Sequence, residues 1–291
     1  MKRIAVLLTC FNRKTKTLAC LRQMYAAYEP HRKEFGISVY LTDDGCTDGT
    51  VDAVYREFAD KNIRILKGTG TLYWAGGMRN SWNESLKGYY DGYLLLNDDT
   101  LVSNNVFSEI MNTHLFSIKY LNTGGIYIGT TSSPENKSEI TYGGSVIMSR
   151  WKHKTKLVMP NGKSPQFCDL ANANIMFVSA HAVQRIGILN DTYTHVLADY
   201  DYTLAARKKG IPVLITSNFC GICENDHPYD INTFVNKSLI ERIKFTYSPL
   251  GFAFTNYLEY YRRNFWYRVP IVFLGGWVKI FFPQMYKSIN N

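Results

Sequence analysis

The sequence predicts an α/β protein with a mostly parallel sheet, flanked by helices on both faces. Residues 3–9 form a continuous apolar run without polar alternation, as expected of a strand that is buried on both faces. Strand and helix patterns then alternate through the first hundred residues, which is typical of a doubly wound, Rossmann-like sheet. Finally, clusters of polar residues follow the strands directly, at positions 10–13, 43–50 and 97–100.

The first half contains four predicted strands and three predicted helices. Each strand is short and apolar, and each helix separates two strands, as in repeated βαβ units. The fourth strand ends directly in Asn97, Asp98 and Asp99. The strands are expected at residues 3–9, 37–42, 63–67 and 92–96, and the helices at 15–28, 50–59 and 76–89.

The second half is less regular. A helix is expected at Asp201–Lys209, with acids in its first turn and a stop at Gly210, as helix dipoles and caps favour. Residues from 257 to the end indicate one or two amphipathic helices. We therefore divide the chain into a main domain, 1–240, and a helical C-terminal segment, 241–291. The remaining strands are expected near residues 125–129, 140–142, 175–179 and 211–215.

The charge balance predicts a negatively charged partner. The chain has 33 lysines and arginines against 24 acids, a net charge of +9. Phosphates, nucleic acid or an anionic membrane all fit that sign. Residues 241–291 carry seven basic residues and two acidic ones, so about +5 of the total lies there. No nucleic-acid-binding motif accompanies them, and nucleic acid is not expected as a partner.

The expected location is the cytoplasm. Six cysteines form no secreted disulfide pattern, and no signal-peptide pattern precedes the first strand. The pair Cys220 and Cys223 lacks the second ligand pair of a structural zinc site. The apolar run at 269–278 is far shorter than the roughly 20 residues that span a bilayer.

The polar clusters after the strands predict a site for a divalent cation and phosphates. Carboxyl ends of parallel strands meet at one edge of the sheet, where ligands bind. Acids packed together repel one another unless a cation neutralises them, and Mg²⁺ or Mn²⁺ takes such oxygen ligands together with phosphates. The alternative for Asp43, Asp44 and Asp48 is a turn and a helix N-cap. Neither GxGxxG nor GxxxxGK[ST] occurs, which argues against dinucleotide dehydrogenases and P-loop enzymes.

Five segments together make the sequence resemble the family-2 inverting glycosyltransferases. They occur in that family's order, at about its spacing, over residues 3 to 230. The third block is also similar to bacterial rhamnosyltransferases and galactofuranosyltransferases. The segments read LLTCFNR, TDDGCTDGT, GTLYWAGGMRNSW, NDDT and HVLADYDYTLAARKKG.

The resemblance implies a GT-A fold, a dTDP- or UDP-linked sugar donor and a divalent metal. By position, Asp43 matches the acid that binds the donor's base, and Asp99 matches the metal-binding acid. Asp98 beside it faces the donor. Asn97 stands where a strict DxD motif has its first acid, and Asp99 is therefore preferred over Asp98 as the metal ligand. The full expected donor-binding set is Thr9, Phe11, Asn12, Arg13, Asp43, Gly76, Gly77, Arg79, Asn97 and Asp98.

Asp199 matches the family's general base. Inversion needs a carboxylate on the face opposite the leaving diphosphate, where it removes the acceptor's hydroxyl proton. Asp199 and Asp201 lie two residues apart at a helix start and point to different sides. We assign Asp201 and Trp74 to the acceptor side, and His227 to the metal. The alternatives are helix-terminal acids for the two aspartates and a structural role for the histidine.

The segment 257–268 mixes aromatic residues with arginines. Such a segment can lie at a bilayer interface, which would put the protein at the inner face of the cell membrane. It can also pack on the main domain, or pair two subunits in a homodimer. The resemblance implies a glycan or lipid-linked glycan acceptor and a role in cell-surface polysaccharide synthesis.

Two other functions fit the composition. A sugar nucleotidyltransferase shares the α/β layout and the metal, but it usually has a glycine-rich basic loop after the first strand, where this chain has residues 10–13. A non-catalytic carbohydrate- or lipid-binding relative would lack the metal acid or the base, whereas Asp99 and Asp199 are both present.

Overall fold

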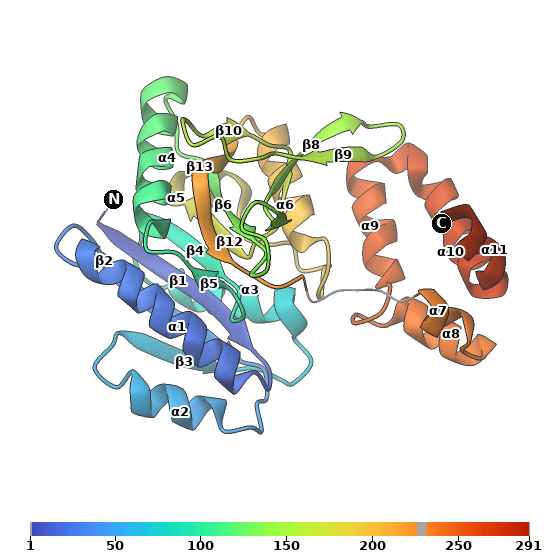
Figure 1. Cartoon of the computed structure of the whole chain (residues 1–291), viewed down its shortest axis with the longest axis horizontal. Coiled ribbons are helices and arrows are strands. Elements are labelled where there is room, and N and C mark those ends of the chain that lie inside the picture. The colour runs from blue at the N-terminus through green and yellow to red at the C-terminus, as the bar shows by residue number, and fades with distance from the viewer. Residues whose placement is uncertain (1, 226–230, 291) are drawn as a thin grey trace.

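The computed structural model describes residues 2–225 and 231–290, and a ten-stranded sheet runs through its centre (Figure 1). Along the main path the strand order is β10-β13-β6-β12-β4-β1-β2-β3. β5 and β7 pair with β13 and β6 respectively. The strands are β1 (Arg3–Cys10), β2 (Gly36–Asp43), β3 (Ile63–Lys67), β4 (Gly92–Leu96), β5 (Leu101–Val102), β6 (Ile126–Ser132), β7 (Ile140–Tyr142), β10 (Gln166–Phe167), β12 (Ile175–Ser179) and β13 (Val213–Ile222).

The strands that carry the predicted site are parallel. β1 lies between β2 and β4 and pairs parallel with both, while β3 pairs parallel with β2. β12 is inserted antiparallel between β4 and β6, and β6 pairs parallel with β13. The predicted α/β class is confirmed, and the parallel part brings the carboxyl ends of β1, β2 and β4 to one edge.

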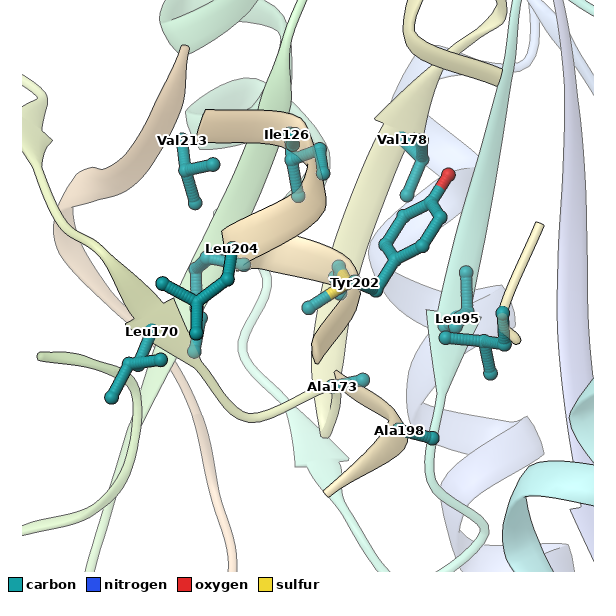
Figure 2. Close-up of a cluster of buried hydrophobic side chains, with 14 of the residues drawn as sticks. Leu95, Ile126, Leu170, Ala173, Val178, Ala198, Tyr202, Leu204 and Val213 are labelled. Atoms are coloured by element: carbon teal, nitrogen blue, oxygen red, sulfur yellow. The ribbon is translucent and has the colours of Figure 1, made fainter. Parts of the chain in front are cut away.

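Helices cover both faces of the sheet, which explains the unbroken apolar run in β1. Ile4, Val6 and Leu8 pack with α1, α2 and α4 on one face. Ala5 and Leu7 pack on the other with α3, α5 and α6 (Figure 2 shows part of this cluster). Alternate side chains of a strand point to opposite faces, so a strand buried on both sides has no polar positions. The helices are α1 (Lys14–Tyr28), η1 (Glu29–His31), α2 (Thr50–Glu57), α3 (Tyr73–Ser85), α4 (Val106–Leu121), α5 (Ala180–Ile186) and α6 (Ala198–Lys208).

A smaller sheet and a long C-terminal segment complete the fold. β11 (Leu170–Ala171), β8 (Gly144–Ser149) and β9 (Lys154–Leu157) form an antiparallel sheet. The C-terminal segment contains α7 (Ile231–Val235), α8 (Leu239–Tyr247), α9 (Phe254–Asn264), η2 (Trp266–Arg268), α10 (Val269–Phe281) and α11 (Pro283–Asn290). This confirms the helical extension, with more helices than the one or two expected.

Helix α9 packs against the main domain. Tyr260 and Phe265 are each 1% exposed and belong to the same buried cluster as Tyr202 of α6. Some aromatic residues of the 257–268 segment therefore pack on the main domain. The domain boundary at residue 240 stays a prediction. Within the described residues, every helix is too short or too polar to cross a bilayer.

Candidate active site

A cavity of about 520 Å³ opens at the carboxyl ends of β1 and β4 and reaches the start of α6. It gathers residues from separate parts of the chain at one place. Eight of the predicted site residues line it: Thr9, Phe11, Arg13, Trp74, Asn97, Asp98, Asp99 and Asp199.

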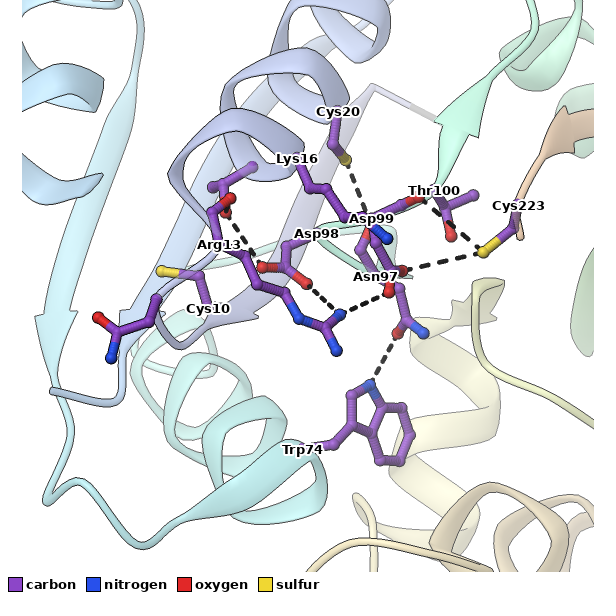
Figure 3. Close-up of polar contacts among 12 residues, drawn as sticks. Cys10, Arg13, Lys16, Cys20, Trp74, Asn97, Asp98, Asp99, Thr100 and Cys223 are labelled. Carbon is purple, nitrogen blue, oxygen red and sulfur yellow. Dashed lines mark hydrogen bonds and ion pairs between the residues drawn. The ribbon is translucent and has the colours of Figure 1, made fainter. Parts of the chain in front are cut away.

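Asp98 and Asp99 both lie close to the guanidinium of Arg13, which follows β1 (Figure 3). Nη1 of Arg13 donates to Oδ2 of Asp99 at 2.5 Å and lies 3.6 Å from Oδ1 of Asp98. The hydroxyl of Thr17 in α1 donates to Oδ2 of Asp98 at 3.0 Å. The turn after β4 is thus fixed to the turn after β1 by charge-assisted hydrogen bonds.

Burial, together with the neighbouring charge of Asp99, raises the pKa of Asp98 to about 7, although Arg13 and Thr17 act in the opposite direction. Asp98 is only 6% exposed. The two adjacent carboxylates repel each other, and the single positive charge of Arg13 offsets their combined negative charge only in part.

This acid pair fits a divalent cation. Carboxylate oxygens are the hard ligands that Mg²⁺ and Mn²⁺ prefer, and the pair opens into a cavity large enough for a nucleotide diphosphate as well. The guanidinium of Arg13 occupies the position of a counter-ion to Asp99. A cation at this place would remove the repulsion that contributes to the raised pKa of Asp98.

Asn97 orients the aromatic side of the cavity. Its Oδ1 accepts a 2.7 Å hydrogen bond from the indole Nε1 of Trp74 (Figure 3). Both residues line the cavity. The indole ring is thereby fixed next to the acid pair, where it offers a flat apolar surface to a ligand.

Asp199 lies in the first turn of α6 on the wall of the same cavity. Its Oδ1 accepts from the backbone N–H of Tyr200 at 2.8 Å, and its Oδ2 accepts from that of Ala173 at 3.2 Å. Burial raises the pKa of Asp199 to about 6, and the two backbone donors act against this rise. A carboxylate with a pKa just below neutrality is ionised at pH 7 and still basic enough to accept a proton.

Three residues at this cavity have a strained backbone. Tyr73 and Leu197 line it, and Asn12 lies between two lining residues; all three have a left-handed φ, of 54°, 68° and 51°. Such conformations are unfavourable for residues other than glycine and tend to occur at functional sites. Leu197 immediately precedes α6, so its backbone conformation sets the direction of the first turn of α6, which carries Asp199.

The structure gives the two acids after β2 different positions. Asp44 lines the cavity, and its carboxylate accepts from the backbone N–H of Gly70 at 2.8 Å and of Tyr73 at 3.0 Å. Asp43, the predicted base-binding residue, lies outside the cavity lining and accepts from the N–H of Cys46 at 2.7 Å. Asp43 therefore closes its own turn, and Asp44 supports the cavity wall.

Gly76, Gly77 and Arg79 do not line the cavity. They lie within α3, where a Cβ on Gly77 would clash with the Thr9 side chain, so this glycine permits close packing of α3 on β1. The guanidinium of Arg79 donates to the carbonyls of Asn190 and Tyr193 at 2.9 and 2.7 Å. Tyr73 and Trp74 at the start of the same helix do line the cavity, and the donor-binding role of Gly76, Gly77 and Arg79 stays a prediction.

Two other predicted residues, Asn12 and Asp201, are also outside the cavity lining. Oδ1 of Asn12 accepts from the N–H of Thr47 at 2.7 Å, joining two loops. Asp201 is 3% exposed and faces α9, where it pairs with Arg263. His227 lies outside the described residues.

Several cavity residues were not predicted. Asn172 and Asn174 come from the segment before β12, and Tyr142 from β7, while His195 and Tyr200 flank the predicted base. Leu250 from the loop between α8 and α9 also lines the cavity, so the C-terminal segment contributes to the site. The block HVLADYDY contained a signal for His195 and Tyr200, whereas the others follow only from tertiary contacts.

A second group of potential metal ligands lies beside the cavity. Ligand atoms of Cys10, Asp43 and Cys46 lie within 4.8 Å of one another, and the two sulfurs are 3.7 Å apart. Burial raises the pKa of both thiols, which keeps them protonated and poorly suited to bind metal. Cys220 and Cys223 are likewise buried free thiols, and Cys223 contacts Asp99.

Neither a protein-family model nor a curated protein matches the sequence. Solved structures do match the fold. S. aureus TarS (residues 1–349) in complex with UDP has a TM-score of 0.56 at 11% identity, and a further structure of S. aureus TarS has 0.54 at 13%. The mannosyltransferase PcManGT from Pyrobaculum calidifontis, in complex with GDP-Man and Mn²⁺, has 0.52 at 13%.

These matches cover most of the chain but only part of its neighbours. They cover 77%, 91% and 81% of this chain, and 60%, 44% and 61% of the respective neighbours. At such identity the likeness establishes the fold alone. The chain therefore has the mixed α/β fold of these structures, as the GT-A prediction required.

Proposed function

We propose that this protein is a metal-dependent, inverting glycosyltransferase that moves a sugar from a nucleotide-diphosphate donor to an acceptor hydroxyl. The observation that carries the proposal is that Asp98, Asp99 and Asp199 line one cavity although about a hundred residues separate the pair from the third acid. The neighbours' complexes with UDP, UDP-GlcNAc and GDP-Man with Mn²⁺ support a nucleotide-sugar donor.

The acid pair would hold Mg²⁺ or Mn²⁺, with Asp99 as the ligand and Asp98 toward the donor. When bound, the cation neutralises charge on the leaving diphosphate. Arg13 would then move from Asp99 to the diphosphate, where a guanidinium stabilises the same developing charge. The donor would be dTDP- or UDP-linked, with its base near Asp43 and Asp44.

Asp199 would remove the proton from the acceptor hydroxyl. Its backbone donors fix the carboxylate, and its raised pKa suits proton transfer near neutral pH. The acceptor oxygen would attack the anomeric carbon from the face opposite the diphosphate. The new glycosidic bond forms as the bond between that carbon and the diphosphate oxygen breaks. The hydroxyl proton goes to Asp199, and the bonding pair leaves with the diphosphate.

The acceptor would be a glycan or lipid-linked glycan used in cell-surface polysaccharide synthesis. The aromatic side chains of Trp74, Tyr142 and Tyr200 on the cavity wall support a sugar acceptor, because rings stack on the apolar faces of pyranoses. The proposal also includes a rhamnosyltransferase-like activity, because the third sequence block is similar to that of rhamnosyltransferases. It further includes a peripheral position on the cytoplasmic surface of the membrane.

A panel of nucleotide sugars with Mn²⁺ or EDTA tests the proposal by thermal shift. We expect one donor class to raise the melting temperature only with the metal, because a ligand that binds the folded state stabilises it. Transfer is then measured with that donor and sugar acceptors, with the product's anomeric configuration read by NMR. A retained configuration, or no donor that binds, would contradict the proposal.

A further inference from the structure

A band of exposed tryptophans and basic side chains runs along the edge formed by the β8–β9 hairpin and η2. It consists of residues 148–157 and 262–268, and none of them lines the active-site cavity. Trp151 and Trp266 are 69% and 75% exposed, although tryptophan is usually well covered. In Figure 1 the hairpin lies beside the end of α9, where the chain turns into α10.

Specific contacts join the two segments into one surface, which we call the Trp–Arg band. The ring of Trp151 stacks on Tyr267 with centroids 5.4 Å apart and planes 7° from parallel. The hydroxyl of Tyr267 donates to the carbonyl of Arg150 at 3.0 Å, and the guanidinium of Arg268 donates to the carbonyl of Trp151. Trp266 directly precedes Tyr267, so both tryptophans are presented by an ordered scaffold.

The band is strongly cationic. Its two segments contain Arg150, Lys152, Lys154, Lys156, Arg262, Arg263 and Arg268, and no acidic residue. Two of these pair with acids outside the band, Arg262 with Glu259 and Arg263 with Asp201. In the part of the chain that the structure describes, no ion pair involves Lys152, Lys154 or Lys156. A second cavity of about 510 Å³ adjoins the band. It is lined by Arg262 and Arg263 of the band, by Arg185, Lys208 and Lys209, and by the buried acid Asp201.

Exposed aliphatic side chains occur within the band and just after it in the sequence. Met148 in β8 is 61% exposed, and Ile271 and Leu274 at the start of α10 are 58% and 62% exposed. Tryptophan, aliphatic side chains and lysines on one edge match the layers of a bilayer surface. Rings lie at headgroup depth, alkyl groups enter the acyl boundary, and lysines meet anionic headgroups.

We propose that the Trp–Arg band is the surface by which this protein lies on an anionic lipid bilayer. A second copy of the chain fits less well, because a two-fold contact would bring like charges together. Nucleic acid would use the cations but leaves Met148, Ile271 and Leu274 without a partner. The inference rests on the membrane contact in the proposed function and assigns it mainly to the hairpin and η2.

Vesicle flotation with the full chain tests the assignment. We expect binding to phosphatidylcholine vesicles with about 30 mol % phosphatidylglycerol but not to phosphatidylcholine alone, and weaker binding in high salt. Reversing Lys152 and Lys154 (K152E/K154E) should weaken binding at least about tenfold, since each cation near an anionic surface adds to the affinity. The matched control K33E/K119E reverses two exposed lysines outside the band and should bind like the wild type.

Tryptophan depth gives a second readout. Lipids brominated near the headgroup should quench the wild-type fluorescence, and W151F/W266F should lose most of that quenching while it still binds. Equal binding to neutral vesicles, or unchanged binding of K152E/K154E, would overturn the proposal. So would tighter binding to an oligonucleotide, or a change of oligomeric state in the variant. Nucleotide-sugar binding is measured by thermal shift on the same samples. A protein that binds the nucleotide sugar but not the vesicles would contradict the membrane assignment alone, whereas one that binds no nucleotide sugar would contradict the proposed function.

Discussion

Asp199 and Asp201 are two residues apart in α6, and they face opposite sides of the helix. Asp199 lies on the wall of the active-site cavity, whereas Asp201 is buried against α9. There, Nε of Arg263 donates to Oδ1 of Asp201 at 3.1 Å, and the side-chain amide of Asn264 donates to the same oxygen at 2.6 Å. Positions two apart on a helix are about 200° apart around its axis, so one acid can serve the site while the other holds the C-terminal segment.

Asp199→Asn should lower kcat for sugar transfer by about 10²- to 10⁴-fold, the usual contribution of a general base. The donor's affinity should change little, because the amide keeps the size of the side chain. Single-turnover transfer and donor binding are measured on the same preparation. Asp191→Asn, an exposed acid on the loop before α6, is the matched control and should behave like the wild type. Unchanged turnover in Asp199→Asn would show that Asp199 is not the general base.

The rate should depend on pH through Asp199. Burial raises the pKa of Asp199 to about 6, above the usual value for aspartate, so kcat/KM should fall about tenfold per unit below pH 6. The folded state favours the protonated form, so the residue's contribution to stability should decrease as pH rises from about 4 to 6. A pH–rate profile checks the first statement, and melting curves of wild type and Asp199→Asn check the second. If the rate in the pH–rate profile fell only around pH 4, the pKa of the catalytic group would not be raised, and the prediction for Asp199 would be wrong.

Arg13→Ala should make the protein more responsive to metal. Arg13 neutralises Asp99 and lies near Asp98, and a bound cation must displace it from that position. Without the arginine, the acids repel each other in the metal-free protein, and Mn²⁺ should stabilise the variant more than the wild type. Melting curves with EDTA and with MnCl₂ measure the difference. Arg22→Ala, which removes an exposed pair with Glu57, should leave the metal response unchanged; an equal response in Arg13→Ala would contradict the prediction.

Asp43 and Asp44 should differ when each is replaced by alanine. Asp44→Ala leaves the N–H groups of Gly70 and Tyr73 without their acceptor, at a cost of about 1–3 kcal/mol for each group that stays buried. It should lower both the melting temperature and donor affinity. Asp43→Ala should weaken donor binding with a smaller loss of stability, because the proposed role of its carboxylate is to bind the donor's base. Calorimetric binding and thermal unfolding separate the two, and a larger stability loss in Asp43→Ala would reverse the roles.

Arg263→Ala should destabilise the contact between α6 and α9. It leaves Asp201, which is 3% exposed, without its cation, although the amide of Asn264 remains. Breaking a buried pair costs about 3–5 kcal/mol; because Arg263 is one-third exposed, we expect about 2–3 kcal/mol. Urea unfolding measures it. The double variant Asp201→Asn/Arg263→Ala should recover part of the loss, because it removes the stranded charge. No recovery would show that the arginine acts through packing alone.

Much of the main sheet could be predicted from the sequence. The strands at 3–9, 37–42, 63–67 and 92–96 agree with β1 to β4 within two residues, because strands buried on both faces are continuous apolar runs. Helix α4 and the sheet of β8, β9 and β11 were not predicted. The small sheet consists of short strands with exposed positions, which give no clear apolar alternation, and β11 pairs with β8 across the intervening β9 and β10.

The site was predicted where its residues follow strands. Thr9, Phe11, Arg13 and the segment 97–99 reach the cavity because the carboxyl ends of parallel neighbours share an edge. Gly76, Gly77 and Arg79 were predicted to bind the donor, but they do not line the cavity. They lie inside a helix, where only the packing against β1 decides which face meets the ligand.

By itself, the sequence determined the order of strands and helices in the first hundred residues, the acids at the ends of β2 and β4, and the cationic character of the C-terminal segment. Those properties follow from local hydrophobic patterns and composition. Only the tertiary structure decided that Asp44 rather than Asp43 lines the cavity, that Asp201 binds Arg263, and that Trp151 meets Tyr267. Each of these depends on which side a residue faces once distant segments pack, and that direction is fixed by contacts that no local pattern contains.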